Sequence, residues 1–210
     1  MQGVYDILLG VYVSSLLTAN FIAGVKLVNL LGFVVPAGFL AYCVTFPVTD
    51  VVAELFGFDA SRRFVLAGFV ANVFSLLLVA AGLAMPPLTP EMQELYVKAF
   101  TPVFRVVAAS LAAYLASQYW DVYVFWWLRV RTRGRYLWLR NNVGELTAQL
   151  IDTCIFITLA FYGTVPTPAL LSAIISQYTW KVVVALLDTP IVYATLYAIR
   201  SAYGVGARSS

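Results

Sequence analysis

The length of the apolar segments constrains this chain more than any other feature. The segment FVLAGFVANVFSLLLVAAGLA, residues 64–84, contains 21 residues and no charged side chain. A helix that spans a bilayer needs about 20 mostly apolar residues. Five further stretches have a comparable character, at residues 4–24, 32–56, 103–128, 143–163 and 169–199.

The composition agrees with membrane insertion. Charged residues make up 11% of the 210 residues and the mean hydropathy is +0.87, whereas soluble domains carry about 25% charged residues. We therefore predict an all-α polytopic membrane protein with six transmembrane helices, in a single transmembrane domain over residues 1–210. Pro190 predicts a kink or a tilt in the sixth helix. For residues 85–102, which are framed by prolines, we predict a short interfacial segment.

Basic residues are concentrated in alternate loops, which predicts the orientation in the membrane. Cytoplasmic loops of membrane proteins carry an excess of Lys and Arg. Three regions, after the second, fourth and sixth helices, contain Arg62, Arg63, Arg129, Arg131, Arg133, Arg135, Arg140, Arg200 and Arg208. The other side has Lys26 and Lys98, with Arg105 just inside the fourth helix. Both termini are therefore expected in the cytoplasm and the chain in the cell membrane.

Several other functions lack support. The basic loop RVRTRGRYLWLR, residues 129–140, is better explained as a topology signal close to anionic lipid than as a nucleic-acid site, so the expected partner is the lipid bilayer. The chain has no histidine and no GxxxxGK[ST] motif, and we expect no metal and no cofactor. Cys43 and Cys154 lie in predicted helices, and their spacing indicates neither a disulfide nor a metal site.

Acidic residues inside the predicted helices are the second unusual feature. The stretch FPVTDVVAELFGF, residues 46–58, places Asp50 and Glu54 one turn apart and hence on one face. Only two bases, Arg105 and Lys181, accompany the six acids at these depths, which are Asp50, Glu54, Asp121, Glu145, Asp152 and Asp188. A central charge costs about 2.5–3.5 kcal/mol on insertion scales. The acids must therefore be paired, protonated or facing a wet cavity, and their excess favours proton or cation coupling.

The spacing of the polar residues predicts a shared interior site. Glu145, Gln149 and Asp152 stand at positions i, i+4 and i+7 of the fifth helix. In the sixth helix, Gln177, Lys181 and Asp188 share a face, with Trp180 beside them. Asn72 lies near the middle of the third helix. Four helices can thus direct polar groups at one volume near the midplane, where transporters bind their substrates.

Structural roles are the alternatives for the same residues. Asp50 and Glu54 can pair with Arg62 or Arg63. Lys181 can neutralise Asp152 or Asp188. The amides of Asn72 and Gln149 can act as hydrogen bonds between helices. Most Phe, Tyr and Trp side chains are expected at the lipid surface or its interfacial belts.

Three motifs resemble those of a known family. Asn20 and Lys26 precede D-x-x-x-E-x-F-G, which here is Asp50, Glu54 and Gly57. Arg140 precedes Q-x-x-D-T-x-I-F, with Gln149, Asp152, Thr153 and Phe156, and Lys181 precedes T-P-x-x-Y, with Thr189, Pro190 and Tyr193. This pattern resembles the YhhQ family, also called VUT, of queuosine precursor transporters. The chain has Asn141, Asn142 and Glu145 where that family often has Ser or Thr.

The resemblance implies import of 7-deazaguanine bases such as preQ0 or preQ1, precursors of queuosine or archaeosine in tRNA modification. It also implies a six-helix fold similar to the S-components of ECF transporters, working without an ATPase partner. A guanine-like edge would donate to Asp152 or Glu54, while Asn72, Gln149 and Lys181 would orient the base. Trp180 or Phe46 would stack on it. The candidates for coupling or gating are Asp50, Glu54, Asp188 and Glu145.

Other classes of protein remain as alternatives. An ECF S-component for a vitamin-like molecule would need an energising partner. An intramembrane aspartyl protease would use two aspartates, but its GxGD motif is absent. A scaffold protein would not explain six acids. The sequence leaves open which deazaguanine is carried, which ion drives transport and whether the chain forms a homo-oligomer.

Overall fold

The computed structural model describes residues 2–24, 26–133 and 137–203, apart from a few side chains near residue 58, from 137 to 141 and from 185 onwards. It is mostly helical. The elements are α1 (Gln2–Ala23), β1 (Leu27–Leu30), β2 (Phe33–Pro36), α2 (Phe39–Cys43), α3 (Thr45–Phe56), α4 (Phe58–Ala84), α5 (Pro90–Arg131), α6 (Leu137–Phe161) and α7 (Thr167–Tyr203).

Within the described residues, five helical stretches are long and apolar enough to cross a membrane. They are Gln2–Ala23, Phe39–Phe56, Asp59–Ala84, Pro90–Arg131 and Asn142–Phe161. Large apolar side chains are exposed along them, such as Leu66, Val70, Phe74 and Leu77 on α4, which is the surface that lipid would cover. A multi-pass helical membrane protein is confirmed. The sixth expected segment lies within α7, and the number of six spans stays a prediction.

The start of the second expected helix, at residue 32, is a β-hairpin instead. Strands β1 and β2 pair antiparallel, with Leu30 opposite Phe33. Leu31 and Gly32 form the turn with φ values of 53° and 88°, and positive φ at both positions matches the right-handed twist of the strands. The Asn29 side-chain oxygen accepts a 2.8 Å hydrogen bond from the Gly32 amide. Because residues 27–38 are mostly apolar, hydropathy alone could not distinguish this turn from a helix. The helix begins only at Phe39.

The fourth expected helix is longer than predicted. Residues 90–102 form no separate interfacial segment but are the first part of α5, which continues through Pro102 to Arg131. Its 42 residues give a length of about 63 Å, about twice the 30 Å of a bilayer's hydrocarbon core. Thr89 caps its start by accepting a hydrogen bond from the Met92 amide.

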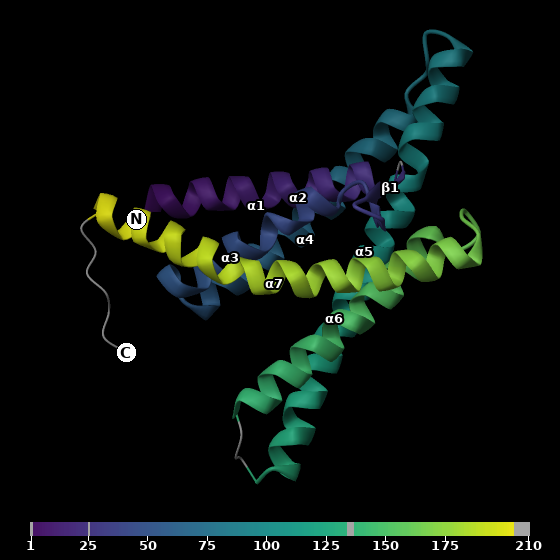
Figure 1. Cartoon of the computed structure of the whole chain (residues 1–210). Helices are drawn as coiled ribbons and strands as arrows, with labels where there is room; N and C mark the ends of the chain where they lie inside the picture. The colour runs from purple at the N-terminus through teal and green to yellow at the C-terminus, as the bar shows by residue number, and fades with distance from the viewer. Residues whose placement is uncertain (1, 25, 134–136, 204–210) are drawn as a thin grey trace.

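The end of α4 and the start of α5 pack together as a projecting pair, which we call the α4–α5 extension (residues 79–101; upper right in Figure 1). The side-chain amide of Gln93 donates to the carbonyl of Leu83 at 3.1 Å. The ring of Tyr96 lies so close to Gly82 that a Cβ there would stand 2.5 Å from its hydroxyl. Side-chain contacts on both helices therefore hold the extension in a fixed shape.

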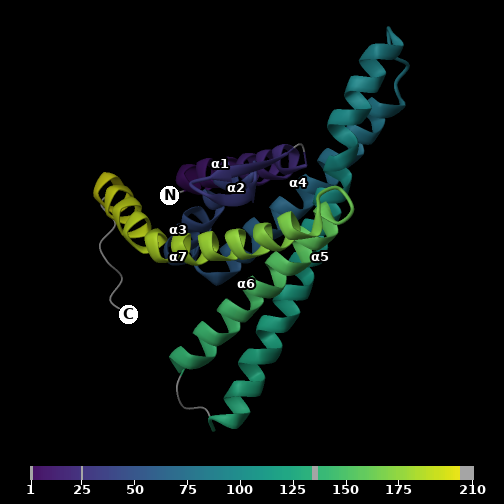
Figure 2. The same ribbon diagram turned by 45° about the vertical axis from the view of Figure 1, so that its right-hand side comes forward.

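The arginine-bearing ends of the elements gather on one side, together with the start of α1. In Figure 1 the start of α1, the α3–α4 turn, the end of α5 and the end of α7 lie toward the left and bottom. The hairpin, the α4–α5 extension and the α6–α7 turn lie toward the right and top, and Figure 2 shows the same separation after rotation. Alternate connections therefore share a side, as the basic residues predict.

Two buried apolar clusters form the core. One joins the end of α1 to α5, α6 and α7, and includes Ala23, Val106, Ile157 and Ala173. The other joins the first half of α1 to α3 and α4, and includes Tyr12, Val52 and Phe64. Helix α1 thus bridges both clusters, and a cavity lies between them.

Candidate substrate cavity

A cavity of about 390 Å³ opens between the two core clusters. Helices α1, α3, α4, α5, α6 and α7 all contribute side chains to its wall. Six of the residues that were assigned a binding or coupling role from the sequence line it, namely Phe46, Asn72, Glu145, Gln149, Asp152 and Lys181. Ligand cavities typically measure about 300–1,000 Å³, so this volume suits a small planar molecule.

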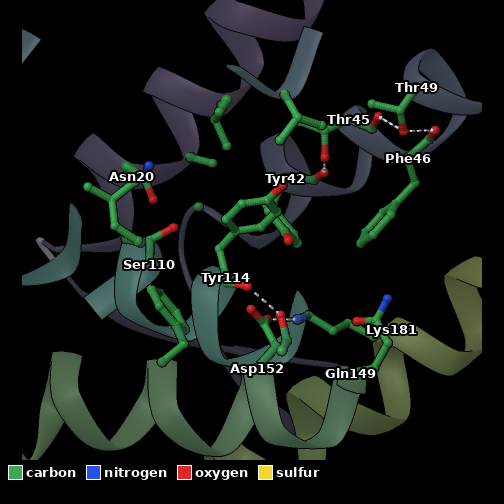
Figure 3. A pocket seen from close by; sticks show the side chains of 18 of the residues that line it. Asn20, Tyr42, Thr45, Phe46, Thr49, Ser110, Tyr114, Gln149, Asp152 and Lys181 are labelled. Carbon is green, nitrogen blue, oxygen red and sulfur yellow. Dashed lines mark hydrogen bonds and ion pairs between the residues drawn. The ribbon is translucent and has the colours of Figure 1, made fainter. Parts of the chain in front are cut away.

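Lys181 and Asp152 form an ion pair in the cavity wall. The Lys181 Nζ lies 2.5 Å from Oδ2 of Asp152, and Figure 3 shows the two side chains meeting. Lys181 is only 3% exposed, and its Nζ lies 5.4 Å from the centroid of the Tyr42 ring, in a cation–π contact. An ammonium group has three donors, so the pair with one carboxylate leaves Lys181 able to donate to a bound molecule.

A pair of asparagines forms a second polar group in the wall. The side-chain nitrogen of Asn20 donates a 2.7 Å hydrogen bond to the side-chain oxygen of Asn72. Asn72 in turn donates to the carbonyl of Gly68 at 2.9 Å. This chain of bonds engages both polar atoms of the Asn72 side chain. In Figure 3 Asn20 lies on the opposite side of the cavity from Thr45 and Thr49.

Helix α6 contributes a row of acidic and amide side chains to the cavity wall, because these residues are spaced about one helical turn apart. Glu145, Gln149 and Asp152 all line the cavity, as positions i, i+4 and i+7 of one helix require. Asp121 of α5 also lines it and lies beside Gly144, where a Cβ would stand 2.6 Å from its Oδ1. Among the described lining residues there are thus three carboxylates for the single base Lys181, so the wall favours ligands with N–H donors.

The comparisons with known proteins agree with this architecture. A family model described as "Putative vitamin uptake transporter" matches residues 36–195. The chain belongs to this family, the VUT family of membrane transporters. Membership confirms the resemblance drawn from the three motifs, and it confirms a transporter and not an enzyme.

Two curated relatives of this VUT chain carry more specific names. A "Probable queuosine precursor transporter" of Bacillus subtilis (strain 168) is 35% identical over 175 residues, which is 81% of this chain and 75% of the relative. A "Queuosine precursor transporter" of Escherichia coli (strain K12) is 27% identical over 135 residues, which is 64% of this chain and 59% of the relative. No solved structure matches the chain.

Some of the expected site residues are not among those that line the cavity of this VUT-family chain. Asp50 and Glu54 are exposed on α3 and are not among the lining residues. The ring of Trp180 packs against Phe33 and Phe39, with centroid distances of 5.9 and 6.2 Å, outside the lining set. The side chain of Asp188 is outside the described residues. The roles expected for these four residues stay predictions.

Other cavity residues were given no binding or coupling role from the sequence, although Gln177, Asn20 and Asp121 were noted there. Tyr42, Tyr114 and Gln177 line the cavity, as do Asn20 and Asp121. Tyr42 and Tyr114 point toward its middle in Figure 3. A signal for Gln177 was present, because it stands one turn before Lys181 on the same helical face. The tyrosines gave no comparable signal, since the chain contains 13 of them and most were assigned to lipid contact.

Proposed function

We propose that this chain imports 7-deazaguanine bases, the precursors of queuosine and archaeosine, across the cell membrane. The observation that carries the proposal is the buried Asp152–Lys181 pair in a cavity of about 390 Å³. A guanine-type base presents a carbonyl acceptor beside N–H donors. Lys181 can donate to the carbonyl, while a carboxylate or amide oxygen accepts from the N–H groups. The names of the two curated relatives support the same substrate class.

The proposed binding roles follow from the cavity wall. Asp152 and Lys181 bind the polar edge of the base, and Gln149 and Asn72 orient it. Phe46 is the aromatic candidate for stacking, because it lines the cavity and packs edge-on against Tyr42 at 5.2 Å between centroids. Trp180 does not line the cavity, but its ring packs against Phe39, which does.

We expect transport to be secondary, driven by a proton or cation gradient and without an ATPase partner. Glu145 is the coupling candidate that lines the cavity. Asp50, Glu54 and Asp188 remain candidates for gating on the cytoplasmic side, in a topology with six spans and both termini in the cytoplasm. Carboxyl groups of this kind are typical of proton relays within membranes.

The test of substrate class uses the purified protein. Binding to the native state raises the melting temperature, so preQ0 or preQ1 should raise it and adenine, biotin and riboflavin should not. Asp152→Asn should abolish the shift. Lys98→Gln is the matched control, because Lys98 pairs with Glu94 on the surface, where both side chains are exposed. A shift with a vitamin and none with a deazaguanine would contradict the proposed cargo.

The test of coupling uses liposomes that contain this chain alone. Uptake of the deazaguanine under an imposed pH or sodium gradient, without ATP, is the expected result. Glu145→Gln should keep the thermal shift but lose the gradient-driven accumulation. Uptake that occurs only after an ATPase module is added would contradict secondary transport.

A further inference from the structure

Gln177 is a buried polar side chain, and one of its two polar atoms has no hydrogen-bond partner in the structure. It lies on α7, lines the cavity and is only 5% exposed. Its side-chain oxygen, Oε1, has no hydrogen-bond partner. Buried polar groups in native proteins are nearly always hydrogen-bonded, and an acceptor left unpaired destabilises the fold. The Oε1 atom is covered in this conformation although Gln177 lines the cavity, so it reaches a ligand there once the side-chain amide turns, and a donor on that ligand would then complete the group.

The neighbours of Gln177 narrow what that ligand would offer. Lys181 stands four residues later, on the same face of α7 and about 5–6 Å away between Cβ atoms. The wall of α7 therefore presents an ammonium donor and, one turn away, an amide acceptor. A lactam edge of the guanine type has the complementary order, with a carbonyl oxygen followed by N–H groups. Adenine has an acceptor nitrogen where guanine has the ring N–H, so it would place an acceptor opposite an acceptor.

A protein partner for Gln177 also has to be considered. The indole nitrogen of Trp180, three residues later, is a buried donor that likewise has no partner. Residues three apart on a helix are neighbours, so a rotation of either side chain could join the two. In the structure they are not joined, and the Trp180 ring packs against Phe33 and Phe39.

We propose that Gln177 is a specificity-determining residue, whose side-chain oxygen accepts a hydrogen bond from the N–H edge of the transported base. This inference rests on the proposed function and extends it to a residue outside the Asp152–Lys181 pair. Lys181 and Gln177 together read the carbonyl and the N–H groups of one edge. Discrimination between guanine-type and adenine-type bases thus arises from two positions on α7.

The experiment compares ligands as well as variants. Kd is measured calorimetrically for the deazaguanine, its 2-desamino analogue and its 1-methyl analogue, on the wild type and on Gln177→Met, which keeps the side-chain length without the amide. The wild type should bind at least one analogue about tenfold more weakly, the value of one neutral hydrogen bond. Gln177→Met should bind the parent base and that analogue about equally, whereas Gln177→Glu, which keeps an acceptor, should retain the preference.

Trp180→Phe is the control, because it removes the indole N–H and keeps an aromatic ring. It should keep the wild-type preference between the parent base and the analogue. If Trp180→Phe and Gln177→Met instead lower the melting temperature equally and non-additively, with the ligand preference unchanged, then Trp180 is the partner of Gln177 and the proposal is overturned.

The remaining outcomes separate this inference from the proposed function. A wild type that binds the deazaguanine and both analogues equally overturns the role of Gln177 and leaves the function standing, without any variant having to fold. Preserved discrimination in Gln177→Met does the same. A wild type that binds no deazaguanine overturns the proposed function, and the role of Gln177 falls with it.

Discussion

At the scale of single residues, the Asp152–Lys181 pair decides both the stability and the chemistry of the cavity. Removal of one partner from a buried ion pair leaves an uncompensated charge, whereas replacement of both partners by apolar groups is often neutral. The pair in this chain has Lys181 almost fully buried and Asp152 partly open to the cavity. Stability and ligand binding can therefore be separated by mutation.

We expect Asp152→Asn to lower the free energy of unfolding by about 3–5 kcal/mol, because Lys181 then stays charged and buried without its partner. The double variant Asp152→Asn with Lys181→Met should recover most of that loss. Neither variant should bind a deazaguanine. The measurement is thermal unfolding in detergent with and without ligand, and a double variant that binds as the wild type does would contradict the assigned roles.

The sequence predicted part of this cavity and missed part of it. Glu145, Gln149 and Asp152 were expected on one face because helical periodicity fixes directions within a single helix. The same rule placed Asp50 and Glu54 on one face of α3, but it could not say that these two side chains are not among those that line the cavity. That outcome depends on how α3 packs against α4 and α7, which no spacing within α3 encodes.

At the scale of elements, α1 packs against the residue that precedes α2, Gly38, through direct contact between the two backbones. A Cβ built on Gly38 would stand 2.0 Å from the carbonyl oxygen of Ala19. Both residues line the cavity, next to Asn20. Because a backbone oxygen cannot rotate away as a side chain can, glycine at position 38 holds α1 close to α2.

Gly38→Ala should therefore separate α1 from α2, with a cost at or above the upper end of the roughly 1–3 kcal/mol typical of overpacking. Its melting temperature should fall, or the folded protein should not be recovered. Gly10→Ala is the matched control, since nothing lies within 4 Å of a Cβ there and alanine favours a helix. Equal melting temperatures for the two variants would show that the two elements can move apart at little cost.

The elements show where hydropathy succeeds and fails. The helix predicted at residues 64–84 starts six residues after the start of α4 and ends at the same residue, Ala84. Hydropathy succeeds here because a long apolar segment between charged and proline-rich segments forms few structures other than a spanning helix. It failed at Leu31 and Gly32, where an apolar turn interrupts an apolar run. It also separated residues 90–102 from α5, since Pro102 indicates a break although the helix continues through it.

At the scale of the whole molecule, the proposed orientation in the membrane can be tested directly. The chain with Cys43 and Cys154 replaced by alanine would carry one new cysteine, at Leu88 or at Arg133, both of which are exposed. A membrane-impermeant maleimide should label Leu88→Cys in intact cells and Arg133→Cys only after permeabilisation, because the basic end of α5 is expected in the cytoplasm. The reverse pattern would invert the topology.

The α4–α5 extension has a practical consequence for imaging. A chain of 23.1 kDa enclosed in a detergent micelle gives electron microscopy few features by which to align particles. The turn at residues 85–89 stands at the tip of two helices locked by Gln93 and Tyr96. An antibody fragment raised against this tip would be held in a fixed orientation, and it would serve as a fiducial mark for determining the transporter with its cargo bound.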